Sequence, residues 1–189
     1  ESIYDPYNRN PLKGDRPLFG TRDWFVNIAM ISDTVVEPRS VPTPVGIQST
    51  DNAGDNDLFG GSDQFIFNEN AIFSLSVIKG DTAYKPPDLE FRLTPVINYN
   101  YAEVEERRVL YADPRQGTER TDTHFALQEA FVDYHIRNVS DRYDFDSVRV
   151  GIQPFSSDFR GFLFQDNQLG VRFFGDRDNN IYQYNLAWF

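Results

Sequence analysis

Residues 89–101 constrain the fold most, because their apolar and polar side chains alternate with a period of two. The odd positions, from Leu89 through Phe91 and Leu93 to Tyr101, are all apolar or aromatic, whereas the even positions are polar except for Val96. Successive side chains of a strand point to opposite sides, so this pattern predicts a strand with one apolar and one wet face. At about 3.3 Å per residue the strand is long enough to cross a membrane.

The same alternation predicts six further strands and an all-β fold. They cover residues 24–36, 64–79, 124–136, 145–154, 169–175 and 181–189. Seventeen Phe and ten Tyr beside a single Met also favour strands over helices. Pro95 removes one ladder hydrogen bond from its strand, so we expect a bulge or a sheet edge there.

The chain organises into an arm and a strand region. Residues 1–22 are rich in proline, glycine, asparagine and aspartate, and predict an irregular arm that packs against the interior or mouth of a barrel. Residues 23–189 hold the strands, with long polar loops at about 38–63 and 103–121. Seven strands suggest part of a larger barrel, because bacterial single-chain barrels have an even number. The alternative is a small complete barrel with an eighth strand near residues 41–47.

Composition excludes several classes of function. A net charge of -11 argues against binding nucleic acid, because the chain cannot neutralise a run of phosphates. The absence of cysteine excludes disulfides and thiolate metal sites. No window approaches about 18 consecutive apolar residues, which excludes a transmembrane helix.

No enzyme, cofactor or resident metal is expected. The chain has neither a Gly-x-Ser-x-Gly elbow nor a glycine-rich phosphate loop. Glu129 and Asp133 would lie about 13 Å apart on one strand, too far for a pair of acid–base carboxylates. The acidic residues Asp51, Asp55 and Asp57 could offer oxygen ligands to Ca²⁺, but they depart from the EF-hand pattern, and a solvated loop is the alternative.

Alternation alone leaves open whether the apolar face meets lipid or a soluble core. Long strands, aromatic residues near strand ends and polar faces of mixed charge favour a transmembrane barrel. The predicted lumen-lining residues are Glu90, Arg92, Glu129, Asp133, Arg149, Gln153 and Arg172. The predicted lipid-facing or girdle residues are Trp24, Phe91, Leu93, Tyr99, Tyr101, Tyr134, Tyr182 and Trp188. The alternative is a soluble β-barrel or sandwich that binds an apolar ligand.

The segment from Phe155 to Phe164 is the most distinctive stretch outside the strands. Its four aromatic residues accompany Asp158 and Arg160, which could form a constriction where the arginine selects anions. The alternative is a hydrophobic turn packed on the rim of the barrel.

Four segments carry a resemblance to a known family: residues 5–15, 90–96, 127–131 and 149–162. They resemble a family of uncharacterised porin-like outer-membrane β-barrel proteins of Gram-negative bacteria. The resemblance implies an antiparallel transmembrane barrel in the bacterial outer membrane, in contact with outer-membrane lipid. It further implies porin-like passage of small solutes or structural anchoring. A third hypothesis is a barrel sleeve that docks a partner protein at the N-terminal arm or in the lumen.

Overall fold

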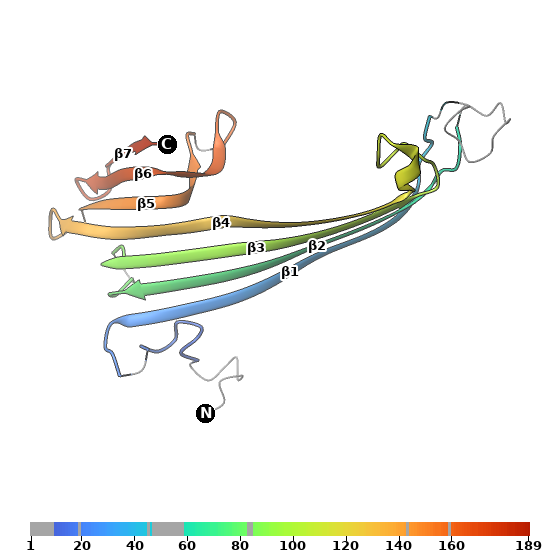
Figure 1. Ribbon diagram of the computed structural model, residues 1–189. Helices are drawn as coiled ribbons and strands as arrows, with labels where there is room; N and C mark the ends of the chain where they lie inside the picture. The colour runs from blue at the N-terminus through green and yellow to red at the C-terminus, as the bar shows by residue number, and fades with distance from the viewer. Residues whose placement is uncertain are drawn as a thin grey trace. The chain divides into compact units, whose positions relative to one another are not determined.

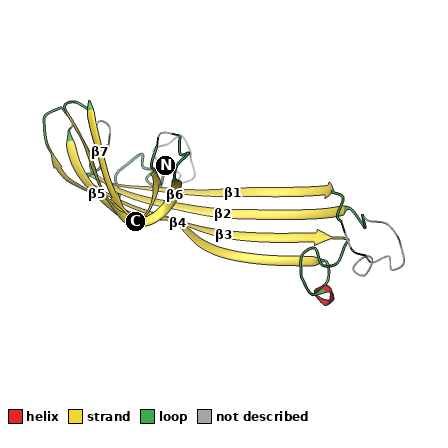
Figure 2. Ribbon diagram, turned by 90° about the horizontal axis from the view of Figure 1, so that it is seen from above, coloured by secondary structure: helices red, strands yellow, loops and turns green. Residues whose placement is uncertain are grey.

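The computed structural model describes residues 10–18, 20–44, 46, 59–82, 85–142, 144–158 and 160–189. The strands are β1 (Trp24–Ser40), β2 (Asp63–Lys79), β3 (Leu89–Val104), β4 (Glu119–Asn138), β5 (Phe145–Ser156), β6 (Gln165–Arg177) and β7 (Tyr182–Trp188). The described helical structure is one 3₁₀ turn, η1 (Pro114–Gln116), drawn in red in Figure 2. None of the described residues forms a helix long and apolar enough to cross a membrane. The predicted all-β fold is confirmed.

The seven strands form one antiparallel sheet in which each strand lies beside its neighbours in the chain (Figure 1). This meander confirms the predicted antiparallel arrangement. The sheet is not closed into a barrel, since β1 and β7 are its two edges. Closure requires the first and last strands to pair, and these two do not pair with each other. The alternative of a small complete barrel is therefore corrected to an open seven-stranded sheet.

The strands extend further than the sequence pattern predicts. β1 continues to Ser40, β3 to Val104, and β4 begins at Glu119, so strands take residues from both expected loops. Of residues 41–47, the described ones form no further strand, and Pro44 makes only an isolated bridge with Phe59. β3 lies between β2 and β4, so Pro95 is not at a sheet edge.

The chain divides into two compact units. Unit 1 comprises residues 1–30, 73–96 and 126–189, and unit 2 comprises residues 31–72 and 97–125. β5, β6 and β7 belong wholly to unit 1, whereas β1 to β4 contribute residues to both units.

Strand register in unit 1 gathers side chains of one kind on each face. Across β4, β5 and β6, Val132 pairs with Val150, and Val150 pairs with Val171. One residue further along, Asp133 pairs with Arg149, and Arg149 pairs with Arg172. Because neighbouring residues point to opposite sides, the valines form an apolar face and the charged residues a polar face. Trp188 of β7 continues the apolar row opposite Val171.

Burial on the two faces is the reverse of that in a water-soluble sheet. On the apolar face, Val150 is 48% exposed, Leu169 70% and Trp188 81%. On the polar face, Asp133 is only 5% exposed and Gln153 is fully buried. Among the described residues, the buried hydrophobic side chains are Val26, Val104 and Phe131, far fewer than the buried polar ones. Soluble proteins rarely leave so large an apolar surface uncovered.

The described part of the N-terminal arm lies along the start of β1, as Figure 1 shows. Lys13 forms a bridge with Asn27, and the amide of Ile28 donates to the carbonyl of Leu12 at 2.8 Å. The amide of Leu18 donates to the carbonyl of Trp24 at 2.7 Å. Residues 10–18 therefore satisfy backbone groups of β1 that would otherwise be open at the edge of the sheet.

Gly151 allows β4 and β5 to approach closely at the centre of the polar face. It has a φ of 128° and lies opposite Phe131 on β4 and Gly170 on β6. A Cβ added at Gly151 would stand 2.1 Å from the carbonyl oxygen of Ala130. Both the backbone conformation and the space therefore require glycine at this position.

Replacing this glycine is expected to disrupt the sheet. Gly151→Ala should lower the free energy of unfolding by about 3 kcal/mol or more, because it combines backbone strain with a clash against β4. Denaturant titration of the folded protein, followed by circular dichroism, measures the change. Val150→Ala, at the exposed neighbouring position, is the control and should cost much less. Equal losses for the two variants would contradict this explanation.

Candidate functional site

The residues predicted to line a lumen lie together on the polar face of unit 1. Arg92 of β3 joins two carboxylates, with its Nη2 2.7 Å from Glu90 Oε1 and its Nη1 3.7 Å from Glu129 Oε2. Thr94 adds a hydrogen bond from its hydroxyl to Glu129 Oε2 at 3.3 Å. The structure thus brings these predicted residues of β3 and β4 into one linked group.

A second ion pair occupies the centre of the polar face. Both Nε and Nη2 of Arg149 contact Asp133 Oδ2, at 2.8 Å and 2.7 Å. The guanidinium lies over the ring of Phe131, 4.4 Å from its centroid, and 5.6 Å from that of Phe174. Flat stacking on aromatic rings is a property of arginine that lysine does not share to the same degree. The buried carboxylate of Asp133 is therefore neutralised by a cation that is itself held in place by aromatic rings.

Arg172 of β6 is the third arginine of this group. It lies directly across the strands from Arg149, and its Nε donates to Asn185 Oδ1 at 2.8 Å. Its guanidinium is 4.7 Å from the ring centroid of Phe174. Among the described residues no carboxylate forms an ion pair with it. Like charges directly opposite each other repel, and Asp133, the acidic partner of Arg149, offsets part of this repulsion.

Gln153 is uncharged and packs against the backbone of the sheet. Its Nε2 donates to the carbonyl oxygens of Gly170, at 3.1 Å, and Arg149, at 3.4 Å. Its Oε1 is buried and has no hydrogen-bond partner among the described residues. The side chain therefore lies on the backbone between β5 and β6 instead of reaching into open space.

The predicted lipid-facing residues divide according to their exposure. Phe91, Leu93, Tyr99, Tyr134, Tyr182 and Trp188 are exposed, whereas Trp24 and Tyr101 are half-buried. Trp24, Tyr182 and Trp188 lie at strand ends, while Tyr99, Tyr101 and Tyr134 lie within longer strands. In unit 1 the apolar face holds a shallow depression of about 390 Å³. It is lined by Leu75, Val77, Phe91, Arg92, Leu93, Ala130, Phe131, Val132 and Val150.

Asp158 organises the turn between β5 and β6. Its carboxylate accepts hydrogen bonds from the backbone amides of Leu163 and Phe162, both at 3.1 Å, and of Arg160 at 3.3 Å. These bonds, that from Leu163 foremost, hold the pKa of Asp158 below its ordinary value of 3.8. The predicted constriction residues are therefore joined through the backbone of their own turn. The side chains of Phe162 and Leu163 are exposed.

No metal centre is evident in the described part of the chain. There, no group of three or more His, Asp or Glu residues could hold a metal ion. The calcium candidates Asp51, Asp55 and Asp57 lie outside the described residues.

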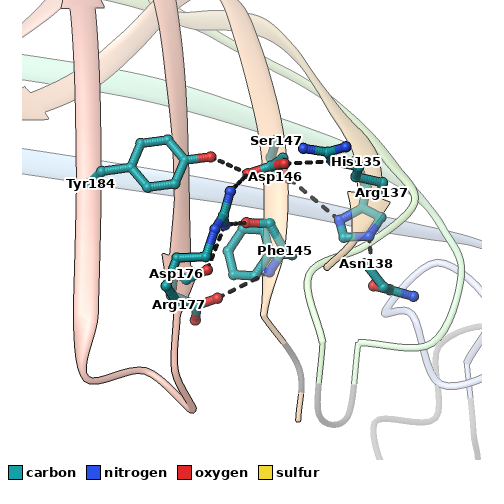
Figure 3. A network of polar contacts seen from close by, with 9 residues as sticks. All are labelled: His135, Arg137, Asn138, Phe145, Asp146, Ser147, Asp176, Arg177 and Tyr184. Carbon is teal, nitrogen blue, oxygen red and sulfur yellow. Dashed lines mark hydrogen bonds and ion pairs between the residues drawn. The ribbon is translucent and has the colours of Figure 1, made fainter. Parts of the chain in front are cut away.

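The sequence pattern did not reveal a polar cluster around Asp146 (Figure 3). The side chain of Asp146 is only 3% exposed and meets Arg137 Nε at 2.8 Å and Arg177 Nη2 at 2.7 Å. The hydroxyl of Tyr184 donates a further hydrogen bond to the same carboxylate. Asp146 shares the parity of Val148 and Val150 along β5, so alternation alone gives no reason to expect a polar cluster there. The two aspartates Asp144 and Asp146 around the start of the strand were the signal available.

The neighbouring turns are tied to this cluster. Asp144 accepts hydrogen bonds from the hydroxyl of Ser140 at 2.7 Å and the amide of Asn179 at 2.9 Å. The bond from Ser140 is the main cause of a lowered pKa at Asp144. Asp176 accepts from the amide of Phe145 at 3.1 Å. These bonds connect the β4–β5 turn to the β6–β7 turn, so the cluster pins two hairpins at one end of the sheet.

Comparisons with known proteins add no relative. No protein-family model matches the chain, and neither a curated protein nor a solved structure shows significant similarity to it.

Removing the central carboxylate of the cluster should destabilise the sheet. Asp146→Ala leaves two arginines and a tyrosine without their shared acceptor, at an expected cost of about 2 kcal/mol in the free energy of unfolding. Denaturant titration followed by circular dichroism measures this loss. Asp141→Ala, in the exposed part of the same turn, is the control and should stay within about 0.5 kcal/mol of the parent. A loss at Asp146 no larger than the control would refute a pinning role.

Proposed function

We propose that the chain forms a section of the wall of a transmembrane β-barrel in a bacterial outer membrane. The observation that carries this proposal is the reversed burial of unit 1. Val150, Leu169 and Trp188 expose apolar surface on one face, whereas Asp133 and Gln153 are buried on the other. Lipid is the solvent that suits the first face, and a wet interior suits the second.

The connections between strands support the same proposal. Residues 80–88, 139–144 and 178–181 join strands at one end of the meander, and residues 41–62, 105–118 and 157–164 join them at the other. When each set is ranked by length, every connection of the first set is shorter than its counterpart in the second. Outer-membrane barrels have short turns on the periplasmic side and longer loops outside the cell. On this proposal, the Asp146 cluster belongs to the periplasmic end.

The open sheet needs further strands to serve this purpose. A lipid-exposed edge would leave backbone groups of β1 or β7 without hydrogen bonds, at a cost of several kcal/mol for each group. We therefore propose that additional strands pair with these edges and complete a larger barrel. Residues 10–18 already cover the start of β1.

The polar face supports porin-like passage of small solutes as the activity. On this face Glu90, Glu129 and Asp133 of β3 and β4 are paired with arginines, whereas Arg172 of β6 forms no ion pair among the described residues. Charges of this kind orient and select ions that pass along a wet channel. Structural anchoring would use the same apolar face without needing the charge pattern, so conductance distinguishes the two activities.

A charge placed on the apolar face tests contact with lipid. Val150→Arg should reduce the stability of the membrane-inserted protein by about 2 kcal/mol or more, because the guanidinium would enter hydrocarbon. Heat-dependent gel migration after reconstitution into vesicles reports the folded fraction. Gln168→Arg on the polar face is the control and should fold like the parent. Ready solubility of the parent without detergent would overturn the proposal and favour a soluble β-sheet protein.

A charge reversal on the polar face tests passage. Arg172→Glu should shift the ion selectivity of single channels toward cations, because Arg172 is the cation of the face that lacks an ion-pair partner among the described residues. The reversal potential in a planar bilayer under a salt gradient measures the shift. Arg115→Glu, on the exposed η1 turn, serves as the control. An unchanged reversal potential for Arg172→Glu would argue against a lining role, and absence of conductance would favour anchoring.

A further inference from the structure

Four asparagines of unit 2 form a closed ring of hydrogen bonds. Asn70 Nδ2 donates to Asn68 Oδ1 at 3.1 Å, and Asn98 Nδ2 donates to Asn70 Oδ1 at 2.7 Å. Asn100 Nδ2 donates to Asn98 Oδ1 at 2.5 Å, and the amide of Asn68 closes the ring by donating to Asn100 Oδ1. Every amide in the ring thus donates one hydrogen bond and accepts one. The ring joins β2 to β3 and contains no charge.

The ring leaves a regular set of hydrogen-bonding groups unused within it. A side-chain amide has two N–H donors and two acceptor lone pairs, so each asparagine retains one of each after closing the ring. All four side chains are half-buried, which fixes their positions while leaving one side accessible. Adjacent donors and acceptors on a fixed support match the neighbouring hydroxyl groups of a sugar, each of which both donates and accepts.

An aromatic side chain shares this face. In the neighbouring strand, Glu129 contacts Thr94, so the odd residues of β4 lie on the same face as the even residues of β3. By this alternation Phe125 belongs to the face of Asn98 and Asn100. Phe125 is 69% exposed. An exposed ring offers an apolar surface for the C–H groups of a sugar.

We propose that the asparagine ring, together with Phe125, binds a neutral soluble saccharide. The asparagine ring itself holds no charge, and its paired donors and acceptors, with the exposed aromatic ring, suit a polyhydroxylated solute. The contact of Arg39 with Gln64 places the odd residues of this part of β1, Asp33 among them, on the same face beside the ring. A site built to bond hydroxyl groups discriminates strongly against solutes that lack them. That sugars meet this site while passing through a channel rests on the proposed function, whereas sugar binding can be measured without a channel.

Titration of the purified protein with maltose, sucrose and glucose tests the site. The protein is held in an alkylphosphocholine detergent, because maltoside detergents would themselves supply sugar. Side-chain amide resonances of Asn68, Asn70, Asn98 and Asn100 are followed by nuclear magnetic resonance. We expect saturable shifts with at least one sugar and a dissociation constant on the order of millimolar. Potassium aspartate and lysine hydrochloride, tested at equal concentration, should leave these resonances in place.

Two variants and a matched control locate the binding. Asn98→Leu breaks the ring, and Phe125→Ala removes the exposed aromatic surface; each should weaken sugar binding about tenfold. Because Phe125 is exposed, its truncation leaves the fold intact even where Asn98→Leu does not. Asn185→Leu, an asparagine of the same face in unit 1, should bind sugar like the parent.

The outcomes separate this proposal from the proposed channel. No shift with any of the three sugars up to about 100 mM would overturn it, since such binding would lie beyond the millimolar range. Equal weakening by Asn185→Leu, or tighter binding of aspartate or lysine, would overturn it as well. Conductance without sugar binding would leave the channel proposal standing alone. Sugar binding without conductance would leave the site standing and remove the channel.

Discussion

Register between β4 and β5 is the constraint on which the rest of unit 1 depends. Because Asp133 lies opposite Arg149, Val132 necessarily lies opposite Val150 on the other side of the sheet. A slip of one residue would exchange the faces and carry the carboxylate into the apolar surface. A buried ion pair contributes little net stability, since desolvating both charges costs about as much as their attraction returns. Its value here is specificity, because the wrong register would leave each charge buried alone.

Glycine and aromatic residues make room for that ion pair. Gly151 and Gly170 face each other across β5 and β6, and Gly151 also faces Phe131. Beside these glycines, the guanidinium of Arg149 lies over the rings of Phe131 and Phe174. The stacked guanidinium keeps its donors directed at Asp133 instead of sampling other rotamers. Charge pairing, aromatic packing and the backbone conformation at Gly151 are thus one arrangement, and a change in any of them affects the other two.

A period of two was enough to predict every strand and the grouping of Arg92, Asp133, Arg149 and Arg172, because alternation assigns faces without knowledge of neighbours. Interactions that depend on pairing were beyond its reach. Asp146 follows the parity of the apolar face, yet it lies at the end of its strand, where two arginines and a tyrosine from other strands meet it. Whether the sheet closes was also beyond its reach, because alternation describes a face and not which strands pair at the edges.

The chemistry of the polar face changes along β3. Glu90 and Arg92, in unit 1, belong to a network of ion pairs, whereas Asn98 and Asn100, in unit 2, belong to a neutral amide ring. Charged groups act on solutes over about a Debye length, roughly 8 Å at physiological salt, but amides act only in contact. On the channel and sugar-site proposals, the ion-pair network would act on ions at a distance. The amide ring would retain sugars, and only through direct contact. The same strand would therefore discriminate between solutes by charge and by hydroxyl content independently.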